Sequence, residues 1–227
     1  MTEMEITIPD EVPVMTLPNV AFFPQALMPL HIFEPRYRAM LRDVLASNRL
    51  FALAGLDRRK AAEGEFEPPH RIATLGIVRA CQNNEDGTAN LLLQGVCRLK
   101  LLQIVSDAPY RVVRAKALSS EPGATPQENE DLRRELTRLL TVRSKLAQDT
   151  VTGMAAFLKT VEDPEAFADL TAFSLCESNA MKQKLLETLD VHHRLRLLGG
   201  QLRSDIADLK LRRKLQGTLP DERISGN

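Results

Sequence analysis

The chain has 227 residues, with 30 Lys and Arg against 30 Asp and Glu, so its formal net charge at pH 7 is zero. Hydrophobic residues make up 44% and charged residues 26%, which is the profile of a folded domain and not of a disordered chain. Zero net charge argues against a protein that coats DNA or a membrane surface. An aromatic content of 4%, without Trp, argues against a platform on which bases or sugars stack.

The cysteine content and the N-terminus bear on the compartment. Three cysteines, Cys81, Cys97 and Cys176, are an odd number and too few for a disulfide framework. The first five residues contain two glutamates where a secretory signal is basic, and no apolar core follows them. No stretch approaches the roughly 18 consecutive apolar residues of a membrane span. These features predict a cytoplasmic protein with reduced thiols.

The first part of the chain is typical of short strands interrupted by one helix. Residues 12–17 form an apolar run that Pro18 and Asn19 end, and a segment rich in Phe and Pro follows over residues 20–33. A helix is predicted to begin at Pro35, since proline suits the first helical turn, where its missing N–H costs nothing. Its apolar face would consist of Tyr37, Met40, Leu41, Val44 and Leu45.

A β-hairpin is the clearest local signal in the sequence. Residues 72–80 and 89–104 are apolar and compatible with strands, and Asp-Gly at residues 86–87 permits the positive φ of a tight turn. Strands are also predicted over residues 50–56 and 110–118. Five or so strands joined by hairpins favour a small antiparallel barrel or twisted sheet. The charged segment over residues 58–70, which contains Pro68-Pro69, is predicted to be a mobile loop.

The second half of the chain is predicted to be helical. Residues 119–125 have the composition of a linker, and Thr125-Pro126-Gln127-Glu128 combines an N-cap, a proline at the first helical position and a capping-box glutamate. Two more N-terminal signals, at residues 163–165 and 178–180, open helices through about Leu175 and Glu187. A long helix is predicted to run from Asp190 to about Leu215.

Sequence motifs for catalysis are absent. No glycine precedes lysine as a Walker A loop requires, and neither G-x-G-x-x-G nor G-x-S-x-G occurs. Ser144 and Lys145 are adjacent on a predicted helix and point in different directions, so they cannot form a dyad. A hydrolase built on Ser144 or His31 would have no recognised motif. The sequence therefore predicts a protein that is not an enzyme and needs no cofactor.

Metal ligation is not expected either. The nearest candidate ligands are Cys81 with Cys97, and the adjacent pair His192 and His193, and neither has a recognised zinc spacing. In the predicted hairpin Cys81 lies opposite about position 91 and Cys97 opposite about position 75, so the two thiols should not face each other.

Several segments resemble one known family. Residues 17–37, Leu-Pro-Asn-Val-Ala-Phe-Phe-Pro through Glu-Pro-Arg-Tyr, are similar to the opening of the Lon protease N-terminal domain. The resemblance continues at residues 75–78, at the Asp-Gly hairpin and at Gly95-Val96-Cys97-Arg98. It ends with Ala168-Asp169-Leu170, with residues 182–187 and with the start of the last long helix at residues 190–195.

The resemblance implies an α+β protein: a β-rich, PUA-like pseudo-barrel subdomain over residues 11–118, a linker over 119–125 and a helical subdomain over 126–216. Residues 1–10 and 217–227 are expected to be disordered tails. In Lon itself this domain precedes an ATP-driven motor and a Ser-Lys peptidase, and the sequence has no Walker A loop. We therefore expect a stand-alone protein that recognises polypeptide substrates and does not cleave them.

Two groups of residues are candidates for contact with a partner. The first is an apolar cluster that either forms a groove for exposed hydrophobic segments or belongs to the core between the first strand and its helix. If the segment is extended, Phe22 and Phe23 point to opposite sides, which would leave one of them available for contact. The full cluster is Phe22, Phe23, Met28, Phe33 and Tyr37.

The second candidate is the basic last helix. Its cations could form a footprint for RNA or an acidic partner, since PUA-like folds include RNA binders, or they could be a solvated helix face whose late cations meet the helix C-terminus favourably. The candidate residues are Arg194, Arg196, Arg203, Lys210, Arg212 and Arg213. We expect polypeptide partners first and RNA as the alternative, with no membrane partner; the sequence leaves the oligomeric state open.

Overall fold

The structure is a computed structural model that describes residues 7–147 and 152–216. These two segments contain a mixed sheet of six strands and seven helices, and the last helix is long. The expected α+β class is therefore confirmed. Each of two compact units is described below on its own.

The two units interleave in the sequence. Unit 1 consists of Met1–Glu121 together with Asp169–Asp190, and unit 2 of Pro122–Ala168 together with Val191–Asn227. The expected helical subdomain over residues 126–216 is thus divided, because its middle segment groups with the strands.

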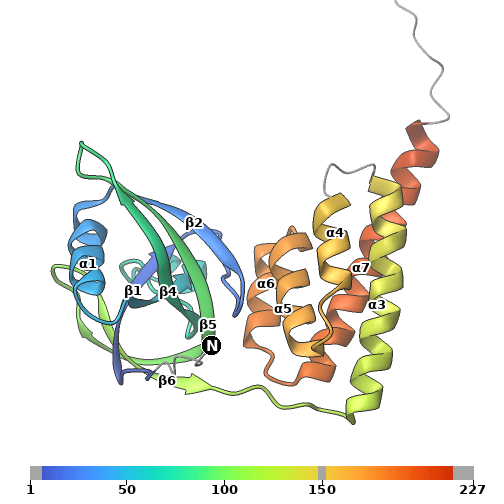
Figure 1. The fold of residues 1–227 in the computed structure, drawn as a ribbon, viewed down its shortest axis with the longest axis horizontal. Coiled ribbons are helices and arrows are strands. Elements are labelled where there is room, and N and C mark those ends of the chain that lie inside the picture. The colour runs from blue at the N-terminus through green and yellow to red at the C-terminus, as the bar shows by residue number, and fades with distance from the viewer. Residues whose placement is uncertain (1–6, 148–151, 217–227) are drawn as a thin grey trace, which may run out of the picture. The chain divides into compact units, whose positions relative to one another are not determined.

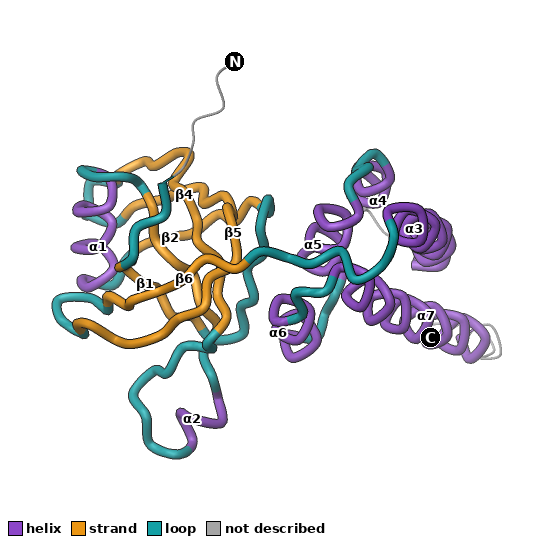
Figure 2. Tube along the Cα trace, turned by 90° about the horizontal axis from the view of Figure 1, so that it is seen from below, coloured by secondary structure: helices purple, strands orange, loops and turns teal. Residues whose placement is uncertain are grey.

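Unit 1 is built on a sheet that closes on itself. Its order is β2-β5-β4-β3-β1-β6, and a further pairing of β5 with β6 joins the last strand back to the second (Figure 2). The sheet therefore forms a ring of five strands, to which β2 adds through the first half of β5. The strands are β1 (Glu11–Leu17), β2 (Leu27–Ile32), β3 (Leu50–Gly55), β4 (Ile72–Asn83), β5 (Ala89–Ser106) and β6 (Val112–Leu118).

Five of the six strands correspond to predicted runs, and two features of the sheet were not predicted. β2 lies within the segment rich in Phe and Pro and was not expected as a strand. β1 and β3 are parallel, with Val14 opposite Ala52, so the expectation of an antiparallel sheet is wrong at this pair. The physical reason is that β2 and α1 lie between β1 and β3 in the chain and form a crossover connection.

The register of the predicted hairpin is confirmed. Cys81 lies opposite Leu91, and Leu75 lies opposite Cys97. Two register shifts occur between these pairs and cancel each other. The three cysteines are free thiols.

The interior of the ring is filled by small and branched apolar side chains. They alternate along the strands, as expected where every second residue faces inward. Burying them supplies the main driving force for folding of unit 1. The members are Val12, Val14, Leu50, Ala52, Ala54, Ala73, Leu75, Ile77, Leu99, Leu101, Val113 and Ala115.

Five of the seven described helices begin where the local signals predicted, whereas α2 and α4 were not predicted. Asp163 accepts a hydrogen bond from the N–H of Ala166, and Ser178 accepts one from the N–H of Met181. In the capping box, Glu128 accepts from the N–H of Thr125 while Thr125 accepts from the N–H of Glu128. The helices are α1 (Pro35–Leu45), α2 (Arg58–Ala62), α3 (Pro126–Ala147), α4 (Thr152–Lys159), α5 (Pro164–Leu175), α6 (Asn179–Glu187) and α7 (Val191–Gln216).

Residues 169–190 join unit 1 through buried polar contacts. The guanidinium of Arg98 donates to both carboxylate oxygens of Asp169, each at 2.7 Å, and to the carbonyl of Leu186 at 3.0 Å. The amide of Gln183 donates to the carbonyl of Ile72 at 3.1 Å. Because Arg98 and Asp169 are both buried, this ion pair replaces hydration that the two charges would otherwise keep.

In unit 2, α3 and α7 run side by side in the same direction (Figure 1). The contacts between them follow the same order along both helices. His192 is hydrogen-bonded to Asn129 near the two helix starts, and Asp205 pairs with Arg143 further along. The buried residues of α7, including Leu195, recur at spacings of three and four, as the sequence predicts.

The expected linker and tails need partial correction. Within unit 1 the N–H of Glu121 donates to the carbonyl of Leu189, and within unit 2 the carbonyl of Pro122 accepts from Asn129. The linker is therefore hydrogen-bonded at both places. At the N-terminus Ile8 packs against the apolar interior of the ring, so the expectation of disorder over residues 1–10 is wrong at this residue. Residues 1–6 and 217–227 lie outside the described residues.

Candidate functional site

Three of the five apolar candidates are buried. Phe22, Phe23 and Tyr37 are at most 5% exposed, so the expectation that one of the two phenylalanines stays available for contact is wrong. The segment that contains them is not a strand, so the alternation that argument assumed does not hold. All three are interior residues of unit 1. The hydroxyl of Tyr37 meets β1 at Thr16, as the other interpretation expected, whereas the ring of Phe22 packs edge-on against Phe173 of α5 with centroids 6.2 Å apart.

Backbone contacts explain why particular residues occur in the Phe22-Phe23 segment and at Gly95. The carbonyl of Phe22 accepts a hydrogen bond from the hydroxyl of Thr74, and the chain at Phe23 passes directly over Gly95. A Cβ on Gly95 would lie 2.0 Å from the carbonyl oxygen of Phe23, so only glycine permits the crossing. The hydroxyl of Tyr37 donates to the carbonyl of Thr16 at 3.1 Å.

The other two apolar candidates remain accessible. Phe33 is 61% exposed and Met28 is half-buried. Leu27, Pro29 and His31 alternate along β2 on the exposed side, and the ring of Phe33 stacks on His31 with centroids 6.0 Å apart. The exposed side of β2 therefore carries Leu27 and Pro29 and ends at the stacked rings of His31 and Phe33.

A second exposed aromatic residue, Phe66, was missed by the sequence analysis. Its side chain is 76% exposed, in the segment predicted to be a mobile loop. That segment instead contains α2, which Asp57 caps. Arg111 then holds the bend at residues 66–67 by donating to the carbonyls of Phe66 and Glu67. A single Phe among glutamates gave no signal that distinguished it from an ordinary surface residue.

One arginine connects the two exposed aromatic residues. Arg36 donates to Glu67 at 2.5 and 3.0 Å and to Glu34 at 2.9 Å. Phe33 precedes Glu34, and Phe66 precedes Glu67, so each phenyl ring is attached one residue from a carboxylate that Arg36 holds. We call Phe33 and Phe66 the aromatic surface.

The electrostatics of this clamp are consistent with its geometry. The hydrogen bond to Glu67 raises the pKa of Arg36, and burial raises the pKa of the adjacent Tyr37. The guanidinium of Arg36 also lies 4.5 Å from the centroid of the Tyr37 ring, within the range of a cation–π contact. Arg36 thus stays charged and fixes the start of α1 to the loop that carries Phe66. Glu67 holds a positive φ of 43°, a conformation that this anchoring stabilises.

The basic candidates on α7 are not all available. Arg194 is fully buried and lies 3.5 Å from Glu165, so it is part of the interior of unit 2. Arg203 pairs with Glu135 of α3. The side chains of Arg196, Lys210, Arg212 and Arg213 are exposed.

The described residues contain neither a candidate metal cluster nor a helix that could span a membrane. No group of three or more His, Cys, Asp or Glu could hold a metal ion within residues 7–147 and 152–216. Over the same residues no helix has the length and apolar character needed to cross a bilayer.

Known proteins are similar in sequence to this chain over most of its length. A Lon protease of Desulfosudis oleivorans is 27% identical over 219 residues, which cover 95% of this chain and 26% of the relative. A Lon protease of Syntrophus aciditrophicus is 26% identical over 218 residues, covering 95% of this chain and 28% of the relative. The chain therefore spans about a quarter of the length of these curated relatives.

Two solved structures share the fold. The N-terminal domain of Mycobacterium avium complex Lon protease superposes with a TM-score of 0.66 at 20% identity, covering 87% of this chain and 98% of that one. A Lon N-terminal domain protein from Xanthomonas campestris superposes with a TM-score of 0.58 at 19% identity, covering 84% and 97%.

The fold is that of these two Lon N-terminal domains, with a mixed sheet and a set of helices in one chain. The sequence then specifies the family. A sequence model of the ATP-dependent protease La (LON) substrate-binding domain matches residues 11–204, and the chain belongs to that family. The matched region is the substrate-binding part of Lon and not its catalytic part.

Proposed function

We propose that this protein is a non-catalytic module that binds exposed apolar segments of other polypeptides in the cytoplasm. Membership of the substrate-binding family supports the class of partner. The chemistry of the aromatic surface supports the kind of segment that binds, because large exposed apolar side chains gain most from covering by another apolar surface.

A single observation carries this proposal: the clamp of Arg36 on Glu34 and Glu67, with an exposed phenylalanine before each carboxylate. An exposed aromatic ring on a loose loop would lose conformational entropy on binding. Here the backbone on both sides is already held, so that less ordering opposes association. Phe33 and Phe66 are therefore suited to bind apolar side chains of many sequences.

The test is binding of a permanently unfolded reporter, reduced and alkylated lactalbumin, followed by fluorescence anisotropy. We expect Phe33→Ser combined with Phe66→Ser to weaken binding about tenfold or more, as loss of buried aromatic contacts does. The matched control is Phe157→Ser in α4, which removes an exposed phenylalanine of unit 2. It should leave the affinity within about twofold.

Two results would reject the proposed site. One is a double variant that binds the reporter as the unaltered protein does, and the other is a Phe157→Ser variant that loses as much affinity. Absence of any binding by the unaltered protein would reject the function itself. Circular dichroism of each variant verifies that the fold is retained.

RNA binding is the second candidate, supported by the exposed cations Arg196, Lys210, Arg212 and Arg213 on α7 and by the occurrence of RNA binders among PUA-like folds. If several phosphates are engaged, affinity for a structured RNA should fall about tenfold or more between 50 and 200 mM salt. Flat salt dependence, or no binding at low salt, would exclude this candidate.

A further inference from the structure

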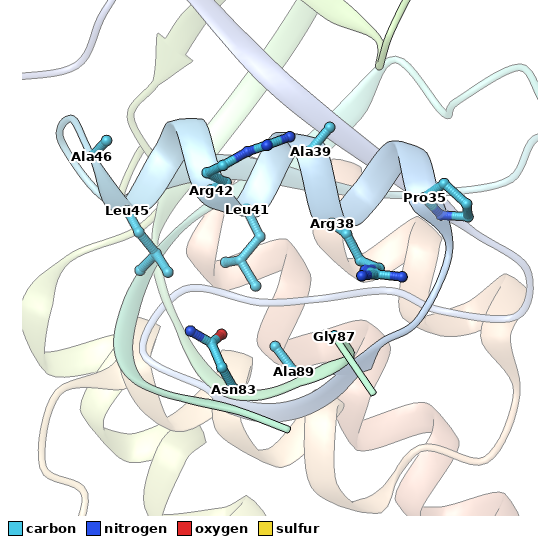
Figure 3. A pocket seen from close by; sticks show the side chains of 10 residues that line it. All are labelled: Pro35, Arg38, Ala39, Leu41, Arg42, Leu45, Ala46, Asn83, Gly87 and Ala89. Atoms are coloured by element: carbon cyan, nitrogen blue, oxygen red, sulfur yellow. The ribbon is translucent and has the colours of Figure 1, made fainter. Parts of the chain in front are cut away.

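A groove separate from the aromatic surface lies between α1 and the β4–β5 hairpin (Figure 3). Its volume is about 870 Å³, within the range of sites that hold a ligand. The buried side chains of Leu41 and Ala89 and the half-buried Leu45 give it an apolar floor. Figure 3 shows Leu41 and Leu45 projecting from α1 toward the strands, with Ala89 on the opposite wall.

The charged side chains that line this groove are all positive. Its lining contains two arginines, Arg38 and Arg42, and no acidic residue. Figure 3 shows Arg38 reaching into the groove toward the hairpin turn, whereas Arg42 runs along the helix. Within the described residues, the guanidinium of Arg38 has no hydrogen bond or ion pair. An anion could therefore bind it without breaking an existing contact.

Neighbouring carboxylates are already engaged elsewhere. Asp86 accepts hydrogen bonds from the N–H and the hydroxyl of Thr88, at 2.9 and 2.7 Å. Glu34 is held by Arg36, and Asp43 accepts from the hydroxyl of Tyr110 at 2.8 Å. Asp86 still lies close enough to Arg38 for the guanidinium to contribute to the lowered pKa of its carboxyl, after the hydrogen bonds from Thr88. Arg38 thus lies beside an apolar floor and near one carboxylate, but forms no hydrogen bond or ion pair with it.

The hairpin turn fixes where that charge lies. A Cβ on Gly87 would lie 2.1 Å from Nη2 of Arg38, so the guanidinium rests directly on this glycine. Gly87 has a φ of +78°, which favours glycine for the turn as well. Asn83, at the end of β4, contributes an amide to the same wall of the groove.

The length of the groove selects a kind of occupant. Its lining residues extend from Pro35 to Ala46, the whole of α1, which is about 16 Å long at 1.5 Å per residue. An extended segment of about five residues has the same length. An RNA strand would use neither the apolar floor nor any aromatic stack, because no aromatic residue lines the groove.

We propose that this groove binds an extended polypeptide segment in which the side-chain carboxylate of an Asp or Glu pairs with Arg38 while a neighbouring apolar side chain covers Leu41 and Leu45. The inference rests on the proposed function in that the partner is a polypeptide, and it adds a second, charge-selective subsite. Segments that carry an acidic residue beside apolar ones would bind better than purely apolar segments.

The test uses the full chain and a fluorescent peptide of about six residues, blocked at both ends, with one Glu between leucines. We expect Arg38→Gln to weaken its binding about five- to tenfold, as loss of a charge-assisted hydrogen bond does. The control Arg71→Gln removes another exposed arginine of unit 1 outside the groove and should change the affinity less than twofold. Arg38→Glu should restore tight binding when the peptide carries Lys in place of Glu.

Other arms separate the alternatives. A peptide with Gln in place of Glu and a free C-terminus should bind weakly; if it binds as tightly as the Glu peptide, the commitment to a side-chain carboxylate is overturned. Binding of single-stranded RNA that Arg38→Gln abolishes would also overturn the proposal. If Arg38→Gln leaves the Glu peptide unaffected while the unfolded reporter still binds, the groove proposal fails and the proposed function stands. If the unaltered protein does not bind the unfolded reporter but binds the Glu peptide through Arg38, the proposed function fails and the groove proposal stands.

Discussion

Arg98 and Asp169 show how single residues of the family motifs carry the fold. One belongs to Gly95-Val96-Cys97-Arg98 and the other to Ala168-Asp169-Leu170, and they meet as a two-pronged ion pair in the interior of unit 1. Such a pair adds little to folding stability compared with apolar residues of similar volume. Removing one partner is strongly destabilising, because the remaining charge stays buried without its partner.

Asp169→Asn should therefore lower the free energy of unfolding by about 3 kcal/mol or more, since it leaves the Arg98 charge in the interior. Urea unfolding followed by circular dichroism measures this change. The control is Glu11→Gln, which breaks the exposed pair with Arg114 and should cost less than about 1 kcal/mol. Equal losses in the two variants would mean that the buried pair has no special role.

Two glycines give a pair of opposite predictions. Gly95→Ala places a Cβ against the carbonyl of Phe23, and backbone cannot move aside as a flexible side chain can, so the melting temperature should fall strongly. Gly153→Ala in α4 meets no heavy atom within 4 Å and should raise it slightly, because alanine favours a helix by about 0.5–1 kcal/mol over glycine. Scanning calorimetry of the two variants gives both signs, and a mild effect at Gly95 would contradict the close crossing.

At the scale of an element, β2 is the free edge of the sheet within the described residues, since the other end of the strand order closes onto β5. Edge strands invite pairing with another chain, and proline within an edge strand blunts it by removing a donor. Pro29 lies in the middle of β2, opposite Leu92.

Pro29→Thr should therefore promote self-association, because it supplies an N–H and a side chain that suits a strand. Sedimentation velocity over a range of concentrations would detect the new dimer. Leu27→Thr is the control: it changes the same strand, keeps the proline and lowers the apolar surface, so it should not associate. A monomeric Pro29→Thr variant would show that the edge is protected in another way.

Glu130 in α3 makes the folding stability of unit 2 depend on pH. The hydrogen bond from Arg133 lowers the pKa of Glu130 from the usual 4.5 to about 2, with Arg134 assisting. A carboxylate whose pKa is depressed on folding stabilises the folded state above its unfolded pKa, and that stability is lost as the pH falls through the folded value. The loss should thus occur between pH about 4.5 and about 2.

Thermal unfolding of Glu130→Gln, compared with the unaltered protein, tests this point. The variant should be less stable at pH 7, and the difference should shrink as the pH approaches 2. Asp131→Asn, which removes a more exposed acid from the same turn, should show a smaller difference at neutral pH. A difference for Glu130→Gln that does not depend on pH would contradict the assignment.

For the whole molecule, the interleaved units decide which fragments can fold. A chain that ends after Glu121 contains every strand but lacks Asp169 for Arg98 and Gln183 for the carbonyl of Ile72. We expect it to bind a hydrophobic dye and to unfold at a lower urea concentration than the intact protein. Adding residues 169–190 as a separate peptide should raise the midpoint with its concentration. A truncated chain as stable as the intact one would disprove the role of this segment.

The sequence predicted whatever depends on neighbours along the chain. The capping box at Thr125 and Glu128 and the register of Cys81 against Leu91 were confirmed because both are set by a few adjacent residues. The parallel pairing of β1 with β3 was missed because it depends on strands joined through a long connection. Phe66 was missed because its support comes from Arg36 and Arg111, which are remote in sequence.

The return of residues 169–190 to the strands has a consequence for synthesis on the ribosome. The ring of strands is translated first, but Asp169 and Gln183 follow the last strand by about fifty residues or more. Until they emerge, Arg98 has no carboxylate to meet and the nascent sheet keeps part of its surface uncovered. Contacts of such long sequence separation slow folding and extend the time during which a chain is open to aggregation. A protein proposed to bind unfolded chains would thus itself pass through a prolonged unfinished state.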